Sequence, residues 1–200
     1  MRIASHCRIT PNRCIANGQT ISVERSERSF LIDLYHALGM SYMKFFKMDN
    51  LCKAGVLSAE VVLRGSGIDG QTPRHDVAVV GLNRSSSLDT DQQHQQNLAT
   101  DNYFPSPAVF VYTLANIVTG EIAIRYKLLG ESSFYVAPKF SAQQMAEVIN
   151  TTFSDTNLNC LLCGWIEVMG QEIDVLMMLI DRNDGLAPTA QNINLLYNDK

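Results

Sequence analysis

The chain has 200 residues and a net charge of −4, with 46% apolar and 18% charged residues. This length suits one domain with a substantial core. No two lysines or arginines are adjacent, which argues against a nucleic-acid-binding patch, and the aliphatic run 175–180 is far too short to span a membrane.

The first third of the chain predicts a hairpin followed by two helices. Apolar alternation over 3–9 and 14–21 predicts the hairpin, and Asn17-Gly18 supplies residues that a tight turn needs. Helical spacing of apolar residues then predicts a helix over 29–38 and a longer one over 42–64.

The middle third predicts a buried strand, a polar loop and a long helix. The run 76–82 is typical of a strand in a parallel sheet covered on both faces. Residues 83–102 are polar and predict a loop with a short helix near 92–98. A helix over 105–129 is expected, because prolines open it and Gly130 stands where a terminator belongs.

The last third predicts a strand, a helix and a hairpin. A strand over 133–137 turns through 138–141 into a helix, and two strands, 159–168 and 173–181, form a hairpin. Strand–helix alternation predicts an α/β fold. We expect one domain over 1–200, with the N-terminal hairpin within 1–25 and a polar, fraying tail at 182–200.

The cysteines predict a reducing compartment. Their number is five, which is odd for a disulfide framework, and the N-terminus lacks the apolar stretch of a signal peptide, so we expect a cytoplasmic protein with free thiols. Cys160 and Cys163 have the CxxC spacing, but positions i and i+3 of a strand point to opposite faces, so we expect a structural role.

Three loops contain residue types that can bind ligands. Asp89, Asp91 and His94 lie in a polar loop without further acidic ligands, so no metal site is expected. The glycines of 65–70 lack the Lys-Ser/Thr of a phosphate loop. The loop 83–87 follows a strand, where α/β proteins bind ligands, but a plain turn is the favoured interpretation. We expect no cofactor.

Four segments resemble the N-terminal half of a β-ketoacyl synthase, which has the thiolase fold. In chain order they are KFFKMDNLCKAGVLSAEVVLR, DVAVVGLNRSSSLDTD, FPSPAVFVYTLANIVTGEIAIRYKLLGE, and SSFYVAPKFSAQQMAEVI with CLLCGWIEV. The resemblance covers residues 43–170 and depends on the order and spacing of the segments. It implies a layered, thiolase-like half-domain in which helices cover a mixed parallel and antiparallel sheet.

The resemblance also implies that the catalytic position has changed. In active synthases a cysteine stands nine residues after the glycine that ends the long helix, at a helix N-terminus that lowers the pKa of its thiol. Counting from Gly130, that position is Lys139 here. The histidines of the family's C-terminal half have no counterpart in this sequence. The chain is therefore similar to the non-catalytic chain-length-factor subunits of type II polyketide systems.

By the same resemblance, we expect the strand 133–137 to pair antiparallel with a partner across a two-fold axis, while residues 104–115 reach toward the partner's acyl tunnel. The expected interface and tunnel residues are Phe104, Phe110, Tyr112, Ser133, Phe134, Tyr135 and Val136. The expected partner is an active ketosynthase of fatty-acid, polyketide or aryl-polyene-type synthesis, or a second copy; an acyl carrier protein is a further expected partner. Two alternatives stay open: an acyltransferase or thioesterase that uses Lys139 or Ser141, and a homodimer that binds an acyl chain passively.

Overall fold

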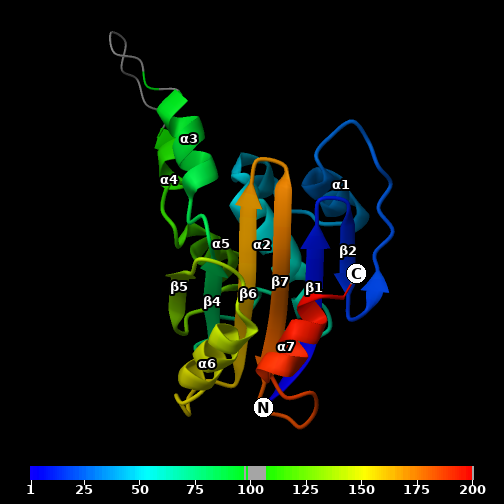
Figure 1. The fold of residues 1–200 in the computed structure, drawn as a ribbon, viewed down its shortest axis with the longest axis vertical. Helices are drawn as coiled ribbons and strands as arrows, with labels where there is room; N and C mark the ends of the chain where they lie inside the picture. Colours follow the sequence, from blue (N-terminus) through cyan, green and yellow to red (C-terminus); the bar gives the residue numbers. More distant parts are fainter. Residues whose placement is uncertain (97, 99–106, 200) are drawn as a thin grey trace.

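A computed structural model describes residues 1–96, 98 and 107–199, and its strands form one mixed sheet (Figure 1). The strands are β1 (Arg2–Thr10), β2 (Arg13–Ala16), β3 (Gln19–Thr20), β4 (Val77–Asn83), β5 (Ser132–Val136), β6 (Cys160–Met169) and β7 (Glu172–Asp181). Their order across the sheet is β3-β2-β1-β7-β6-β4-β5.

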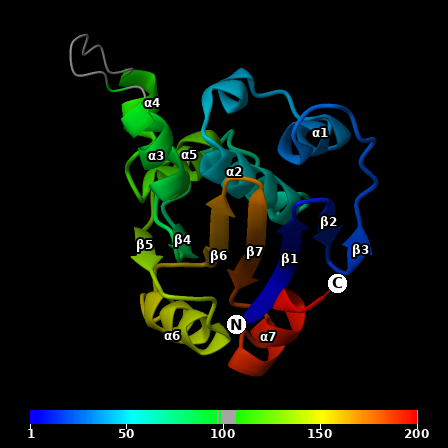
Figure 2. The same cartoon turned by 45° about the horizontal axis from the view of Figure 1, so that its top comes forward.

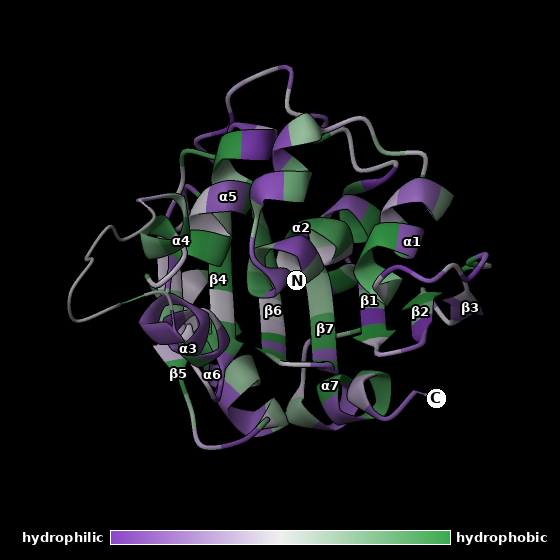
Figure 3. Ribbon diagram, turned by 90° about the horizontal axis from the view of Figure 1, so that it is seen from above, coloured by the Kyte–Doolittle hydropathy of each residue, from purple (hydrophilic) through white to green (hydrophobic). Residues whose placement is uncertain are grey.

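Helices cover both faces of this sheet. They are α1 (Phe30–Ala37), the 3₁₀ helix η1 (Met43–Lys47), α2 (Asn50–Leu63), α3 (Leu88–Gln96), α4 (Pro107–Val111), α5 (Ile117–Tyr126), α6 (Ala142–Thr152) and α7 (Ala190–Tyr197). Helices α1, α2 and α5 lie on one face, and α6 and α7 lie on the other (Figure 3). Among the described helices, none is long and apolar enough to cross a membrane.

The pairing of the strands confirms the predicted α/β fold class. β4 is parallel to both β5 and β6, while β7 is antiparallel to β6 and to β1. The sheet therefore mixes parallel and antiparallel pairs, as the fold requires when a hairpin joins a βαβ arrangement.

Alternate residues of β4 build two separate cores, one on each face. Val77 and Val79 join the cluster under α1, α2 and α5, whereas Ala78, Val80 and Leu82 join the cluster under α6 and α7. Every residue of β4 is buried, which explains why its sequence is a continuous apolar run.

Two predicted elements in the N-terminal third are divided. The predicted second strand is β2 and β3, which are joined by Asn17 (φ +50°) and Gly18 (φ +78°). The predicted helix 42–64 is η1 followed by α2. A new helix begins there because the carboxylate of Asp49 caps it, accepting a hydrogen bond from the N–H of Cys52 at 2.8 Å.

The predicted helix 105–129 is also two helices, α4 and α5. Its start, residues 105–106, lies outside the described residues. The chain turns between the two helices at 112–116, where the Tyr112 side chain is buried. Helix α5 ends at Lys127, which has φ +52°. Gly130 is therefore no terminator; a methyl group there would lie 2.4 Å from the carbonyl oxygen of Val77, so β4 requires a glycine.

The remaining corrections concern α3 and the tail. The short helix expected near 92–98 is α3, which begins earlier, at Leu88. The tail does not fray along its length, because α7 docks on the sheet with Ile193 fully buried. The Tyr197 ring also stacks on Phe140, with 3.6 Å between centroids. The polar composition of 182–200 gave no sign of this contact, because Phe140 lies far away in the sequence.

Candidate functional site

The turn from β5 into α6 carries the two residues considered as nucleophiles. Lys139 is exposed in this turn, and in the described part of the chain its ammonium forms no hydrogen bond or ion pair. The Ser141 Oγ caps α6 by accepting a hydrogen bond from the N–H of Gln144 at 3.2 Å. Among the described residues, neither side chain is hydrogen-bonded to a histidine or a carboxylate that could act as its general base.

Aromatic side chains fill the space beside this turn. Phe140 lies between Lys139 and Ser141, stacks on Tyr197, and contacts Trp165 edge to face at 5.9 Å. The Asp174 carboxylate accepts hydrogen bonds from the Trp165 Nε1–H at 3.1 Å and the Tyr197 hydroxyl at 2.6 Å. The turn is thus packed against the chain's own C-terminal helix.

The edge of β5 is the candidate interaction site. β5 is the last strand in the order of the sheet, so one of its sides has no strand partner among residues 1–96, 98 and 107–199. The Val79 N–H donates to the Glu131 carbonyl and the Ala137 N–H to the Asn83 carbonyl, each at 2.8 Å. Because backbone groups alternate in direction along a strand, the N–H and C=O groups that point away from the sheet belong to Ser132, Phe134 and Val136.

Exposed apolar side chains gather on the same side of the molecule. Among the described residues, thirteen large apolar side chains are exposed, and eight of them lie between positions 88 and 136, in α3, α4, α5, β5 and the described parts of their connections. They are Leu88, Phe110, Val111, Leu114, Ile124, Leu129, Tyr135 and Val136. These elements lie side by side at one end of the sheet (Figures 1 and 2). An exposed edge strand with apolar neighbours marks an interaction surface.

The expected interface residues fall into different environments. Phe110 is 58% exposed on α4, with its ring 5.8 Å from that of His94. Phe134 is half-buried, and a methyl group at Gly81 would lie 2.7 Å from its Cδ2. Tyr112 is only 7% exposed and cannot reach a partner as expected. Phe104 lies outside the described residues.

Tyr112 belongs to the core under α1, α2 and α5, where it contacts the buried carboxylate of Glu121. Its hydroxyl donates to Glu121 Oε1 at 3.3 Å, and Lys44 Nζ lies 2.6 Å from Glu121 Oε2. Burial, followed by the charge of Glu121, raises the pKa of Tyr112. Glu121 was missed from the sequence, although its position next to Ile122 and three residues after Val118 places it on the buried stripe of the helix.

A second buried carboxylate holds the loop after β4. Glu167 is 6% exposed, and its carboxylate accepts hydrogen bonds from the Arg84 N–H at 2.7 Å, the Ser85 N–H at 3.1 Å and the Ser85 hydroxyl. These contacts make the loop 84–87 a braced turn.

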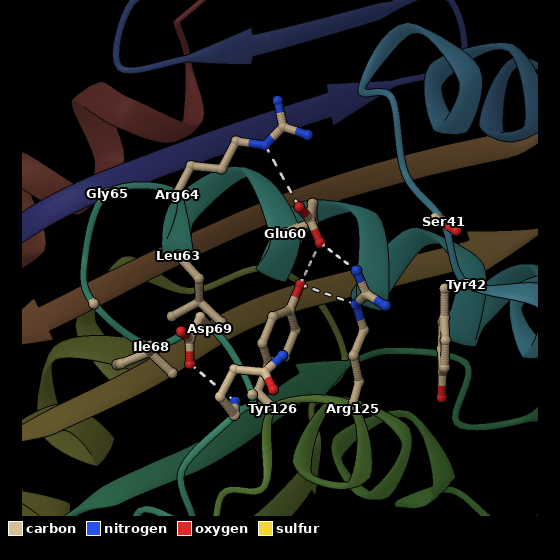
Figure 4. Close-up of a pocket in the computed structure, with 13 residues that line it drawn as sticks. Ser41, Tyr42, Glu60, Leu63, Arg64, Gly65, Ile68, Asp69, Arg125 and Tyr126 are labelled. Atoms are coloured by element: carbon tan, nitrogen blue, oxygen red, sulfur yellow. Dashed lines mark hydrogen bonds and ion pairs between the residues drawn. The ribbon is translucent and has the colours of Figure 1, made fainter.

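A pocket of about 650 Å³ lies beside α2 and α5, and the residues that line it do not include any of β5 (Figure 4). Its charges are mostly paired with each other. Glu60 binds Arg125 at 2.6 Å, the Tyr126 hydroxyl at 2.7 Å and Arg64 at 3.5 Å. Although burial opposes ionisation, these donors lower the pKa of Glu60. Internal neutralisation leaves no excess charge here to select a ligand.

The other candidate sites remain structural. Cys160 joins the core on one face of the sheet and Cys163 the core on the other, and all five cysteines are free. Asp89 accepts a hydrogen bond from the Gly170 N–H at 2.9 Å. Across residues 1–96, 98 and 107–199, no three His, Cys, Asp or Glu side chains are grouped to hold a metal ion.

The architecture is that of the ketosynthase, or thiolase-like, fold. No family model matches the sequence, and no curated protein is significantly similar to it. The fold follows from solved structures. A chain of "The ishigamide ketosynthase/chain length factor" matches with a TM-score of 0.65 and 11% identity, over 90% of this chain and 62% of that one.

Two further structures give the same fold. A chain of "Ketosynthase (ApeO) in Complex with its Chain Length Factor (ApeC) from Xenorhabdus doucetiae" has a TM-score of 0.62 and 14% identity, over 98% of this chain and 90% of that one. A chain of "AntDE:AntF (apo): type II PKS acyl-carrier protein in complex with its ketosynthase bound to the hexaketide" has a TM-score of 0.57 and 12% identity, over 91% of this chain and 64% of that one. This chain therefore spans less than two thirds of two of the three matched chains.

Proposed function

We propose that the chain is a non-catalytic, ketosynthase-like subunit that pairs through β5 with an active ketosynthase. The observation that carries the proposal is the edge of β5, which no described strand pairs with and which lies beside exposed apolar side chains. Lysine at the nucleophile position supports a structural role, because an acyl-lysine amide would not be turned over as a thioester is. Two of the matched structures are named as ketosynthases with a chain length factor.

The reaction served would be fatty-acid, polyketide or aryl-polyene-type synthesis on acyl carrier protein thioesters. The five free thiols suit the cytoplasm, where such a pair would work. In this proposal Phe110 contacts the partner near its acyl tunnel, whereas Tyr112 acts only inside its own chain.

The outward backbone groups define how a partner strand would pair. An antiparallel strand opposite Ser132, Phe134 and Val136 can exchange two hydrogen bonds with each of them. The next outward residue, Pro138, has no N–H to donate, so the ladder would end there. A second copy of this chain can use all three residues only in the two-fold register centred on Phe134.

The test is co-expression with a ketosynthase encoded beside this chain. Val136→Pro removes one outward N–H at a position where an edge strand tolerates proline, and Val136→Thr is the matched control. We expect at least a tenfold higher Kd for Val136→Pro, because a lost hydrogen bond of about 1–1.5 kcal/mol and a steric clash act together. The Kd of Val136→Thr should change less than twofold.

Two results would contradict the proposal. One is a chain that purifies as a lone monomer beside every ketosynthase tested, and the other is a partner whose product length is unchanged by Phe110→Ala. Self-pairing is tested separately in a Cys160→Ser background. Ser133→Cys with Tyr135→Cys should form an intermolecular disulfide in the register centred on Phe134, since these positions then form a closely spaced, non-hydrogen-bonded pair. Either cysteine alone reports a register centred on itself.

A further inference from the structure

The segment that follows β4 extends beyond the sheet as an arm, which we define as residues 84–96 and 107–116 (Figures 1 and 2). Its exposed apolar side chains are Leu88, Phe110, Val111 and Leu114. The arm joins the rest of the chain at two roots. The first, 84–87, leaves β4, and the second, 112–116, leads into α5. The direction of the arm depends on how these roots are held.

The first root is held by two buried polar side chains of the sheet. Glu167 accepts the N–H groups of Arg84 and Ser85. Asn83, which is fully buried, donates from Nδ2 to the Ser86 carbonyl at 2.8 Å and accepts the Ser86 N–H at 2.9 Å. Ser86 is thereby kept at φ +53°, a left-handed conformation that a serine rarely adopts.

The second root is held by the buried Glu121. Tyr112 donates its hydroxyl to this carboxylate, which Lys44 neutralises from η1. The Ser87 hydroxyl donates to the Thr113 carbonyl at 2.7 Å, so the two roots are also joined to each other. Each root is therefore hydrogen-bonded to a buried carboxylate, which is Glu167 for the first root and Glu121 for the second. A core built only of apolar residues would contain no such carboxylates.

Buried carboxylates are poor sources of stability, since well-packed apolar residues usually serve as well, but they impose direction on their partners. We propose that Glu121 and Glu167 are positioning residues that fix the arm in the direction in which Phe110 and its apolar neighbours meet the partner. This inference rests on the proposed pairing with a ketosynthase. A surface ordered before binding loses less conformational entropy when the complex forms.

The test removes one hydroxyl and measures the free chain first. Tyr112→Phe should speed amide exchange over 107–116 at least fivefold while exchange in β4 and β6 is unchanged. Tyr42→Phe is the matched control, because the Tyr42 hydroxyl forms no hydrogen bond among the described residues. Glu167→Gln should speed exchange over 84–87 and gives a second, independent variant if Tyr112→Phe folds poorly.

Binding then separates positioning from general stability. Tyr112→Phe should raise the Kd for the ketosynthase about tenfold in the wild-type background and less than twofold in a Phe110→Ala background, because the arm then has lost its main contact. Unchanged exchange in both variants, or an equal tenfold loss in both backgrounds, would overturn the inference. A wild-type chain that binds no ketosynthase would instead refute the proposed function, and the exchange experiment would still decide whether the carboxylates order the arm.

Discussion

The contacts of Tyr197 allow a quantitative prediction about the C-terminal helix. The ring stacks on Phe140, the Arg8 guanidinium lies 4.5 Å above it, and the hydroxyl donates to Asp174 at 2.6 Å. These contacts are worth about 1 kcal/mol for the aromatic pair, about 0.5–1 for the cation–π contact and about 1.5 for the charged hydrogen bond. Tyr197→Ala should therefore lower the free energy of unfolding by roughly 3 kcal/mol.

Urea denaturation followed by circular dichroism measures this loss, and the single tryptophan, Trp165, reports locally because it touches Phe140. For a chain of this size the loss corresponds to a Tm lower by about 6–12 °C. Tyr197→Phe removes only the hydroxyl and should cost about 1.5 kcal/mol. Leu195→Ala, at a residue 63% exposed on the same helix, is the control and should cost less than about 0.5 kcal/mol. If the free energy of unfolding of Tyr197→Ala also stays within about 0.5 kcal/mol of the wild-type value, the contacts of Tyr197 do not stabilise the docking of α7 as described.

Three further predictions concern the core and the titrating groups. Hydrogen bonds from Arg74 hold the pKa of Asp76 well below its usual range, so the stabilisation from this contact is present above about pH 4 and is lost as the pH falls toward the lowered pKa. In urea titrations, the wild type should be more stable than Asp76→Asn by about 1 kcal/mol at pH 7, and this difference should close in acid. A difference that stays constant with pH would contradict this prediction. Ile149→Ala should cost about 2–5 kcal/mol by the same titration because the side chain is fully buried, and Ile149→Val only about 0.5–1.5; equal losses would refute the described packing. A thiol reagent should label Cys160 first, because it is the one cysteine of the five that is not fully buried. Burial also raises the pKa of Cys163 to about 12, so rapid labelling of Cys163 would contradict this prediction.

Local patterns were sufficient to predict the elements whose sequences have one clear signal. β4, β6 and β7 are largely continuous apolar runs, and α1 and α6 have apolar residues at helical spacing, so their types followed from the sequence pattern. The turn from strand into helix that holds Lys139 likewise followed from residues 138–141, whereas the count from Gly130 to the nucleophile position came only from the family resemblance.

The break between α4 and α5 could not be predicted in the same way. The period of the apolar residues continues through 112–116, whereas Tyr112 in the break contacts Glu121, which pairs with Lys44 of another segment. The docking of the tail could not be predicted for a similar reason, because α7 contacts Phe140, far away in the sequence. The one local signal at the second root was Glu121, a glutamate on an otherwise apolar stripe, which indicated a buried polar contact there.

The pairing of β1 with β7 has a consequence for how the chain folds during synthesis. Arg2 lies opposite Asp181, so β1 pairs with a strand that the ribosome makes much later. The β1–β2 hairpin must wait for β7 before this long-range neighbour exists, and contacts so distant in sequence slow folding. Until β7 is translated, α2 has no complete sheet to cover, and its apolar face is open to chaperones and to aggregation.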